Sequence, residues 1–357
     1  MHQISNIKKM NKNIRKKYLI PVSVCMLVLF GLIYYYFFSS FSAIRGTQYV
    51  YIDNNDNIDS VFTKLEKIST AHSMSGFRIL ANHSQYANHI RTGRYGIKSG
   101  DGALKIFRHL KNGLQSSLDL TIPSVRTVDK LASELSKKLM VDSTQILHAL
   151  KDEATCQKYG YDTTTIACIF IPNTYDIYWN ISPEKLLDRM QKESKKFWNA
   201  DRISKAQQIQ LTPNEVITLA SIIDEETANN TEKPMVAQMY LNRLKFRSGK
   251  YPEGMPLQAD PTIKFALKQF GLHRIYTNML HVKSPYNTYT NVGLPPGPIR
   301  IPTVAGIDAV LNHANHDYLY MCAKEDFSGT HNFARTYEEH MRNAAKYANA
   351  LNHQGIK

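Results

Sequence analysis

The feature that most constrains this chain is an uncharged, apolar run at residues 18–38, which follows a basic N-terminal segment. Its 21 residues match the roughly 20 that an α-helix needs to cross the hydrocarbon core of a bilayer. Six of the first 17 residues are Lys or Arg and none is acidic, while residues 34–38 are all aromatic. Basic residues tend to stay in the cytoplasm, and aromatic rings favour the membrane interface. We therefore predict a cytoplasmic tail over 1–17, a transmembrane helix over 18–40 and an exported remainder.

A cleaved signal peptide is the alternative for this segment, because residues 40–43 (Ser-Phe-Ser-Ala) resemble a small-residue cleavage site. The apolar region of a signal peptide usually has about 7–15 residues, and this run is longer, which favours the uncleaved anchor. The basic tail also accounts for six of the 14 net positive charges. Since the remainder of the chain is only mildly basic, we expect no nucleic-acid partner.

The four cysteines give little support to a metal or redox site. Cys25 lies in the apolar run, Cys156 and Cys168 are 12 residues apart, and Cys322 stands alone. Cys156 and Cys168 can pair in an oxidising compartment, and the sequence leaves that pairing open. Neither Cys-x-x-Cys, His-Glu-x-x-His nor a phosphate-binding glycine loop occurs, so we expect no metal and no cofactor.

The exported part has no internal repeat, and its pattern predicts the α+β class. Around residues 41–118, two short strands alternate with amphipathic helices, one starting near Ile58 and one running through Leu104, Phe107, Leu110 and Leu114. A region over 119–210 follows, with a strand at 118–122, a helix capped by Thr127 and a charged helix at 183–208. Its aromatic loop at 169–175 either paves a groove or is a plain buried loop.

The most informative segment begins at Thr212, which is followed by Pro213 and Glu215. This is a capping box with proline at the first helical position, and it predicts the start of a helix. At 100° per residue, Leu219, Ile222, Ile223 and Glu226 share one stripe. The same spacing places Thr218, Ser221 and Glu225 on a polar face, with Asp224 between the two.

Glu226 is therefore the acid that continues the apolar face. Burial of a carboxyl group raises its pKa, and a carboxyl that stays protonated near neutral pH can act as a general acid. The structural alternative is that Glu226 ends the buried stripe and pairs with an arginine such as Arg243.

Polar and aromatic residues gather downstream in three loops at 256–262, 284–290 and 293–299, the last of which is stiffened by proline. Aromatic faces, amides and hydroxyls on a rigid frame are what a carbohydrate groove needs. The candidate substrate-binding residues are Gln258, Asp260, Thr262, Tyr286, Asn287, Tyr289 and His331, and His340 adds a further titratable group.

Residues 219–227, Leu-Ala-Ser-Ile-Ile-Asp-Glu-Glu-Thr, resemble the catalytic helix of the YceG-like family of endolytic murein transglycosylases. Similar motifs follow in the family's order at 257–262, 286–289, 293–299, 318–320 and 331–333, and weaker ones precede at 93–97 and 170–174. The resemblance implies that Glu226 is catalytic and that Asp224, which replaces a family glutamate, supports it. The family's Asn-Pro-Gly is Ile-Pro-Thr at 301–303 here. The resemblance also implies a LysM-like module over 41–118 and a mixed α/β YceG-like domain, with its catalytic region over 211–357.

Three hypotheses for function follow from the residues and the resemblance. The first is a lytic enzyme that cuts the β-1,4 bond between N-acetylmuramic acid and N-acetylglucosamine in nascent glycan strands, leaves 1,6-anhydro ends and so terminates elongation. The second is a non-catalytic glycan-binding scaffold. The third is a muramidase that hydrolyses the bond with Asp260 as the second carboxylate. The implied location is the bacterial inner membrane, with a single-pass anchor and a periplasmic catalytic domain. The implied partners are peptidoglycan strands, the membrane, and penicillin-binding or other wall-synthesis proteins.

Overall fold

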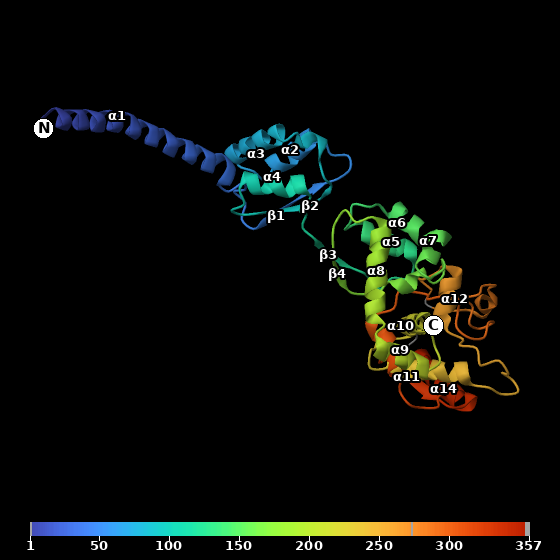
Figure 1. Ribbon diagram of the computed structural model, residues 1–357. Coiled ribbons are helices and arrows are strands. Elements are labelled where there is room, and N and C mark those ends of the chain that lie inside the picture. The colour runs from blue at the N-terminus through green and yellow to red at the C-terminus, as the bar shows by residue number, and fades with distance from the viewer. Residues whose placement is uncertain (1, 273, 354–357) are drawn as a thin grey trace. The chain divides into compact units, whose positions relative to one another are not determined.

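The computed structural model describes residues 2–272 and 274–353, and for residues 2–16 it describes the backbone alone. The chain divides into two compact units (Figure 1). The first contains residues up to Leu118 together with Asp176–Asn180, and the second contains Asp119–Tyr175 and the residues from Ile181 onward. The regions predicted over 119–210 and 211–357 therefore share one unit.

The first unit begins with the predicted apolar helix. Helix α1 (His2–Ile33) continues into a π-helical segment, η1 (Tyr34–Phe38). Within this run, Lys17–Phe38 is long and apolar enough to cross a membrane, and none of its most apolar stretch is buried as a core helix would be. The single apolar helix predicted at the N-terminus is thus confirmed, and it is consistent with a single-pass anchor.

The aromatic end of this run belongs to the folded unit. The ring of Tyr35 stacks on His72 with centroids 4.0 Å apart, and Ser40 forms a bridge to Gly102. The backbone of η1 approaches α3 (Ala71–His83) so closely that a Cβ at Gly76 would lie 2.1 Å from the carbonyl oxygen of Tyr36. Glycine is required there because only its missing side chain permits this approach.

The remainder of the first unit is built on an antiparallel pair of strands, β1 (Thr47–Ile52) and β2 (Gly93–Lys98), whose register runs from Thr47 opposite Lys98 to Ile52 opposite Gly93. Its other elements are α2 (Ile58–Glu66), η2 (Tyr86–Asn88) and α4 (Ala103–Asn112). The strands and the helices at 58 and 103 are confirmed, while α3 was not predicted. The core gathers around the fully buried ring of Phe77, which makes edge-to-face contacts with Phe41, Phe62, Tyr86 and Phe107.

One detail of the predicted α4 helix is wrong. The helix ends at Asn112, where Gly113 takes a left-handed conformation, so Leu114 lies beyond it and is exposed. Ala103, Ile106, Phe107 and Leu110 form the buried face. A glycine with positive φ ends helices because it carries no Cβ penalty, and this stop signal outweighs the apolar spacing that extended the prediction.

The strand β3 (Leu118–Thr121) pairs with β4 (Thr174–Ile177) in a two-stranded sheet. The other elements between residues 119 and 210 are α5 (Val128–Ser136), α6 (Ser143–Lys151), α7 (Glu153–Lys158), η3 (Ile166–Ile169), α8 (Pro183–Phe197) and α9 (Ala200–Gln208). The hydroxyl of Thr127 accepts from the backbone N–H of Lys130, which confirms the predicted cap.

Three other expectations, for a charged helix, an aromatic loop and the cysteines, are corrected or decided by the structure. The charged helix over 183–208 is two helices, separated at Trp198 and Asn199, and α8 buries Leu186, Leu187 and Met190. Ile169, Phe170 and Ile171 are almost fully buried, so the loop at 169–175 is a buried loop and does not pave a groove.

All four cysteines are free, and the thiol of Cys156 donates to the carbonyl oxygen of Leu150.

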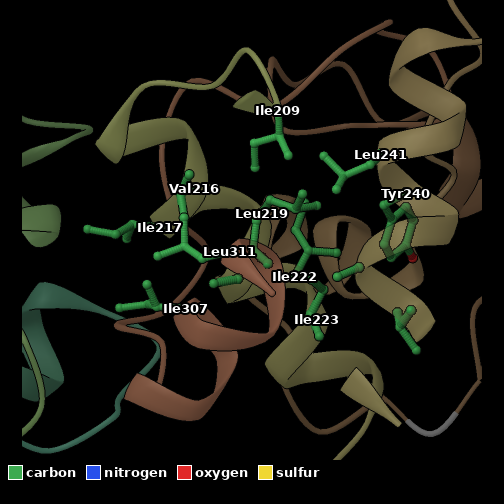
Figure 2. Close-up of a cluster of buried hydrophobic side chains, with 14 of the residues drawn as sticks. Ile209, Val216, Ile217, Leu219, Ile222, Ile223, Tyr240, Leu241, Ile307 and Leu311 are labelled. Atoms are coloured by element: carbon green, nitrogen blue, oxygen red, sulfur yellow. The ribbon is translucent and has the colours of Figure 1, made fainter. Parts of the chain in front are cut away.

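The centre of the second unit is α10 (Pro213–Glu226), which Thr212 caps through the predicted box with Glu215. Around it lie α11 (Lys233–Lys245), α12 (Asp260–Leu267), η4 (Thr277–His281), α13 (Val304–Leu311), α14 (Tyr337–His353) and the antiparallel pair β5 (Tyr320–Ala323) and β6 (His331–Ala334). Figure 2 shows the cluster formed by apolar side chains of α10, α11 and α13.

The predicted polar face of α10 is wrong, because every residue from Val216 to Ile223 is buried. The hydroxyl of Thr218 donates to the carbonyl oxygen of Asn214 at 2.8 Å. Ser221 Oγ donates to the carbonyl oxygen of Thr218 at 2.6 Å and accepts from the backbone N–H of Ile299 at 3.0 Å. Small hydroxyl groups can be buried when hydrogen bonds satisfy them, so polarity alone did not mark the exposed side of this helix.

Candidate functional site

A pocket of about 360 Å³ in the second unit brings together residues from α10, α11, α12, β5, β6 and α14. Five predicted site residues line it: Glu226, Gln258, Asp260, Tyr289 and His331. The lining also includes residues that the prediction did not place in a site, among them Tyr240, Tyr320 and Tyr337. Phenols, amides, imidazoles and carboxyl groups therefore surround a space large enough for a small ligand.

Glu226 is the last residue of α10, and its carboxyl group faces a phenol. Tyr240 Oη donates to Glu226 Oε1 at 2.6 Å, and within residues 2–272 and 274–353 the other oxygen, Oε2, has no hydrogen-bond partner. Burial raises the pKa of Glu226 to about 7, and the nearby Asp260 raises it further, while the Tyr240 hydrogen bond, His331 and Arg243 oppose this rise. Both forms of the carboxyl group are thus present near neutral pH, which suits a group that first donates and later accepts a proton.

The structural alternative, in which Glu226 pairs with Arg243, is not what the structure shows. Arg243 Nε donates to the carbonyl oxygen of Leu319 at 2.6 Å, and its Nη1 donates to that of Leu257 at 2.5 Å. Arg243 thereby fixes the chain segments that lead into β5 and α12, and Glu226 has no ion pair among the side chains that the structure describes. A neutral phenol lowers the pKa of a neighbouring carboxyl group less than a guanidinium cation does, so the pKa of a buried carboxyl group stays raised beside a phenol.

Asp260 and Tyr289 form a second polar pair in the pocket. Asp260 opens α12, and Tyr289 Oη donates to its Oδ1 at 2.5 Å. Gln258 precedes this pair with a φ of 49°, a left-handed conformation that is uncommon for a residue other than glycine. Its backbone N–H donates to the carbonyl oxygen of Thr288, which holds the two loops together.

Thr262 and Asn287 lie beneath this wall and do not line the pocket. Thr262 Oγ1 lies 2.8 Å from Thr288 Oγ1 and donates to the carbonyl oxygen of Ala259. The Asn287 amide donates to the carbonyl oxygens of Leu280 and Val282, both at 2.9 Å. Both side chains are fully buried, so their place in the fold is to hold the loops that carry Asp260 and Tyr289.

His331 is held by a glutamate that the sequence analysis did not identify. Glu232 Oε1 accepts from the backbone N–H of His331 at 2.6 Å, and Oε2 lies 3.0 Å from Nδ1. Glu232 is buried and lies 99 residues earlier, between α10 and α11. Because Nδ1 is engaged, Nε2 is the ring nitrogen that remains for a ligand in the pocket.

Two further predicted residues, besides Thr262 and Asn287, lie outside this pocket. Asp224 forms an ion pair with Lys233 at 2.7 Å and accepts from the backbone N–H of Thr303 at 2.5 Å, so it can support Glu226 by fixing the end of α10. Tyr286 lines a different pocket and packs on Phe265 with ring centroids 4.7 Å apart.

Sequence reasoning missed Tyr240, Glu232 and Tyr337. Tyr240 lies in an apolar helix, where a tyrosine usually indicates a core residue, and its phenol is indeed buried. Burial and the neighbouring Glu226 raise the pKa of Tyr240 well above its usual value, so it stays a hydrogen-bond donor. The only available signal was that a buried tyrosine needs a partner for its hydroxyl group.

The arrangement defines a class of site. A carboxyl group with a pKa near neutrality, open on a pocket of phenols and imidazoles, has the features that general acid–base catalysis requires. The YceG-like family model matches residues 50–346, and the chain belongs to this family.

Relatives that carry a named activity agree with that assignment. The chain is 26% identical over 326 residues to an endolytic murein transglycosylase of Bacillus subtilis, an alignment that covers 86% of this chain and 87% of the relative. It is also 26% identical over 332 residues to an endolytic murein transglycosylase of Streptococcus pneumoniae, covering 84% of this chain and 58% of that longer protein. The crystal structure of a YceG-like protein from Listeria monocytogenes, 25% identical, superposes with a TM-score of 0.52 over 84% of this chain and 99% of that one.

Proposed function

We propose that this protein is an endolytic murein transglycosylase. It cleaves the β-1,4 bond between N-acetylmuramic acid and N-acetylglucosamine within nascent strands, leaves a 1,6-anhydro end and so terminates elongation. The observation that carries the proposal is Glu226, a carboxyl group with a pKa of about 7 in an open pocket that other polar groups line. Membership of the YceG-like family and the named activity of the relatives support it.

In the first step, protonated Glu226 donates its proton to the glycosidic oxygen. The bond from this oxygen to C1 of the muramic acid breaks, and the N-acetylglucosamine side leaves as an alcohol. Tyr240 occupies Oε1, so Oε2 is the oxygen that can hold the transferable proton. The same hydrogen bond stabilises the carboxylate that forms when the proton leaves.

In the second step, the Glu226 carboxylate accepts the proton of the muramic acid C6 hydroxyl group. The C6 oxygen forms a bond to C1, which closes the 1,6-anhydro ring and returns Glu226 to its protonated form. No water is consumed, and one carboxyl group serves both steps, unlike the pair of carboxylates that hydrolases use.

The test of this proposal is the mass of the products from purified glycan strands. An anhydro end is lighter by one water than the end that a hydrolase leaves. Products with the anhydro mass support the proposal, and products that contain the added water indicate a muramidase with Asp260 as the second carboxylate. A protein that binds strands and releases no fragments would instead be a glycan-binding scaffold.

The other parts of the chain are assigned roles consistent with this activity. The apolar helix over Lys17–Phe38 anchors the enzyme in the inner membrane with the basic tail in the cytoplasm and the catalytic unit outside. The first unit, with its order β1, α2, α3, β2, is a LysM-like module that contacts glycan. Penicillin-binding proteins or other wall-synthesis proteins are the expected protein partners. Protease added to spheroplasts will digest everything beyond the anchor if this orientation is right and will spare it if the orientation is reversed.

A further inference from the structure

A second pocket, which the proposed reaction does not use, lies wholly within the second unit. It measures about 340 Å³, and residues near the start of α5, around Thr164 and in α12 line it. Tyr286, which the sequence places close to Tyr289, lies here and not in the pocket of Glu226. Ligand pockets in proteins typically span roughly 300–1,000 Å³, so this one suits a small ligand or the end of a peptide chain.

The charges on this pocket are mostly positive. Four cationic side chains and one acid line it: Arg126, Lys151, Lys268, Arg300 and Asp129. Both arginines bond to the same acid, Glu225, at 2.8 and 3.1 Å, and Lys151 pairs with Asp129 at 2.9 Å. Lys268 has no ion pair within the part of the chain that the structure describes. The pocket therefore has more cations than acids, and one ammonium group remains available to an anion.

The walls next to Lys268 are apolar. Its Nζ lies 3.8 Å from the centroid of the Phe265 ring, which packs against Tyr286, and Ala167 and Pro298 also line the pocket. A doubly charged phosphate is strongly hydrated and loses much of its solvation in such surroundings. A single carboxylate that carries a small apolar group fits better, since its charge meets the ammonium and its methyl group meets the rings.

We propose that this pocket binds the C-terminal carboxylate of a short peptide and that Lys268 is its ionic partner. The inference rests on the proposed function, because murein strands carry short peptides that end in a free carboxylate. Binding at this pocket gives the enzyme a second contact with its polymer.

Titration calorimetry of the full chain in a neutral detergent tests the proposal directly. The probes are N-acetyl-D-alanyl-D-alanine, its C-terminal amide and inorganic phosphate. We expect the free acid to bind and the amide to bind at least about tenfold more weakly, because a charge-assisted hydrogen bond is lost. Equal binding of acid and amide, or tighter binding of phosphate, overturns the proposal.

A pair of lysine variants on α12 and its C-terminal cap provides the matched control. Lys268→Gln removes the ammonium from the pocket and should weaken binding of the free acid by about tenfold. Lys264→Gln removes the same charge from α12 at a position that does not line the pocket, and it should leave binding unchanged. The arginines are unsuitable for this test because they also hold Glu225. Equal losses in the two variants would indicate general electrostatic attraction and would overturn the site.

The experiment also separates this inference from the proposed reaction. Binding is measured without turnover, and a Glu226→Gln chain should bind the free acid as well as the wild-type chain does. Peptide binding together with products that contain added water would overturn only the transglycosylase reaction. Normal anhydro products from a chain that binds no peptide would overturn only the peptide pocket.

Discussion

The end of α10 carries three consecutive acids, and the two sides of this helix end give them different partners. Asp224 and Glu225 face cations: Asp224 pairs with Lys233, and Glu225 pairs with Arg126 and Arg300. Glu226 faces a neutral phenol, Tyr240, and an open pocket. The cation side holds the helix end in place, and the phenol side presents one carboxyl group to a ligand.

The difference shows how one short segment can contain both structural and reactive carboxyl groups. A cation within about 4 Å favours the ionised form of a carboxyl group, whereas burial without a cation favours the protonated form. Burial raises the pKa of Glu226 to about 7. The partner of each acid, and not its residue type, decides which of them can donate a proton.

The largest effect is expected from Glu226→Gln, which keeps the volume of the side chain but removes the transferable proton. A general acid typically contributes about 10²–10⁴-fold in rate, and this group acts in both steps, so the loss should reach or exceed about 10⁴-fold. The rate of anhydro-product formation measures it. Near-normal cleavage by this variant, with Glu225→Gln inactive instead, would show that Glu225 and not Glu226 is the proton donor.

Asp224→Asn tests the cation side. Asp224 and Lys233 are both almost fully buried at their side chains, and loss of one charge leaves the other uncompensated. The expected loss in the free energy of unfolding is about 3–5 kcal/mol, measured by denaturant titration. The rate per folded molecule should fall only several-fold. Adding Lys233→Met removes the stranded charge and should recover part of the stability, and a double variant no more stable than the single one would contradict the ion-pair explanation.

Glu226→Gln should also change the dependence of stability on pH. The folded state binds the Glu226 proton more tightly than the unfolded state, whose pKa lies near 4.5, so wild-type stability is lost as pH rises from about 4.5 to about 7. The variant lacks this loss. Above pH 7 we expect it to be roughly 1–3 kcal/mol more stable relative to wild type than it is at pH 4. Parallel stability curves of the two proteins over this range would show that burial does not raise the Glu226 pKa.

Tyr240→Phe tests how the hydrogen bond from the phenol affects the pKa of Glu226. The Tyr240 hydrogen bond lowers the pKa of Glu226 against the larger effect of burial, so its removal should raise this pKa further. The high-pH limb of the activity profile, where Glu226 loses its proton, should therefore move to higher pH. We also expect kcat to fall by roughly tenfold, since the carboxylate formed in the first step loses a hydrogen bond from the phenol. A limb that moves to lower pH would contradict this assignment.

The smallest effect is expected from Glu225→Gln. The side chain is one tenth exposed and holds Arg126 and Arg300, which are themselves partly exposed. Partly exposed pairs contribute modestly, so unfolding should become easier by about 1 kcal/mol. Cleavage should change by no more than about threefold, because Glu225 does not line the pocket of Glu226. A loss of activity as large as that of Glu226→Gln would show that the two sides are not independent.

Several elements could be predicted because their signals are local. The cap formed by Thr212, Pro213 and Glu215 sets where α10 begins, and a fixed start with 100° per residue sets which side chains share a stripe with Glu226. The apolar run over 18–38 and the alternating strands of the first unit depend on spacing alone. The predicted polar face failed because Thr218 and Ser221 bond to backbone groups, which no spacing reveals.

The candidate site could be predicted only in part, for a physical reason. Gln258, Asp260, Tyr289 and His331 line the Glu226 pocket, whereas Thr262 and Asn287 support it from below and Tyr286 lies in the other pocket. Residues a few positions apart on a loop point in different directions once the loop folds, and their sequence distance does not record this.

By itself, the sequence determined an N-terminal apolar helix, a capped helix with one acid on its apolar stripe and a set of polar loops, since each depends on neighbours within a few residues. Only the tertiary structure decided that Tyr240 is the partner of Glu226, that Glu232 holds His331 and that Arg243 bonds to carbonyl groups. These contacts join residues 14 to 99 positions apart. The pKa of a carboxyl group depends on burial and on such distant partners, so its chemistry is set when the chain packs.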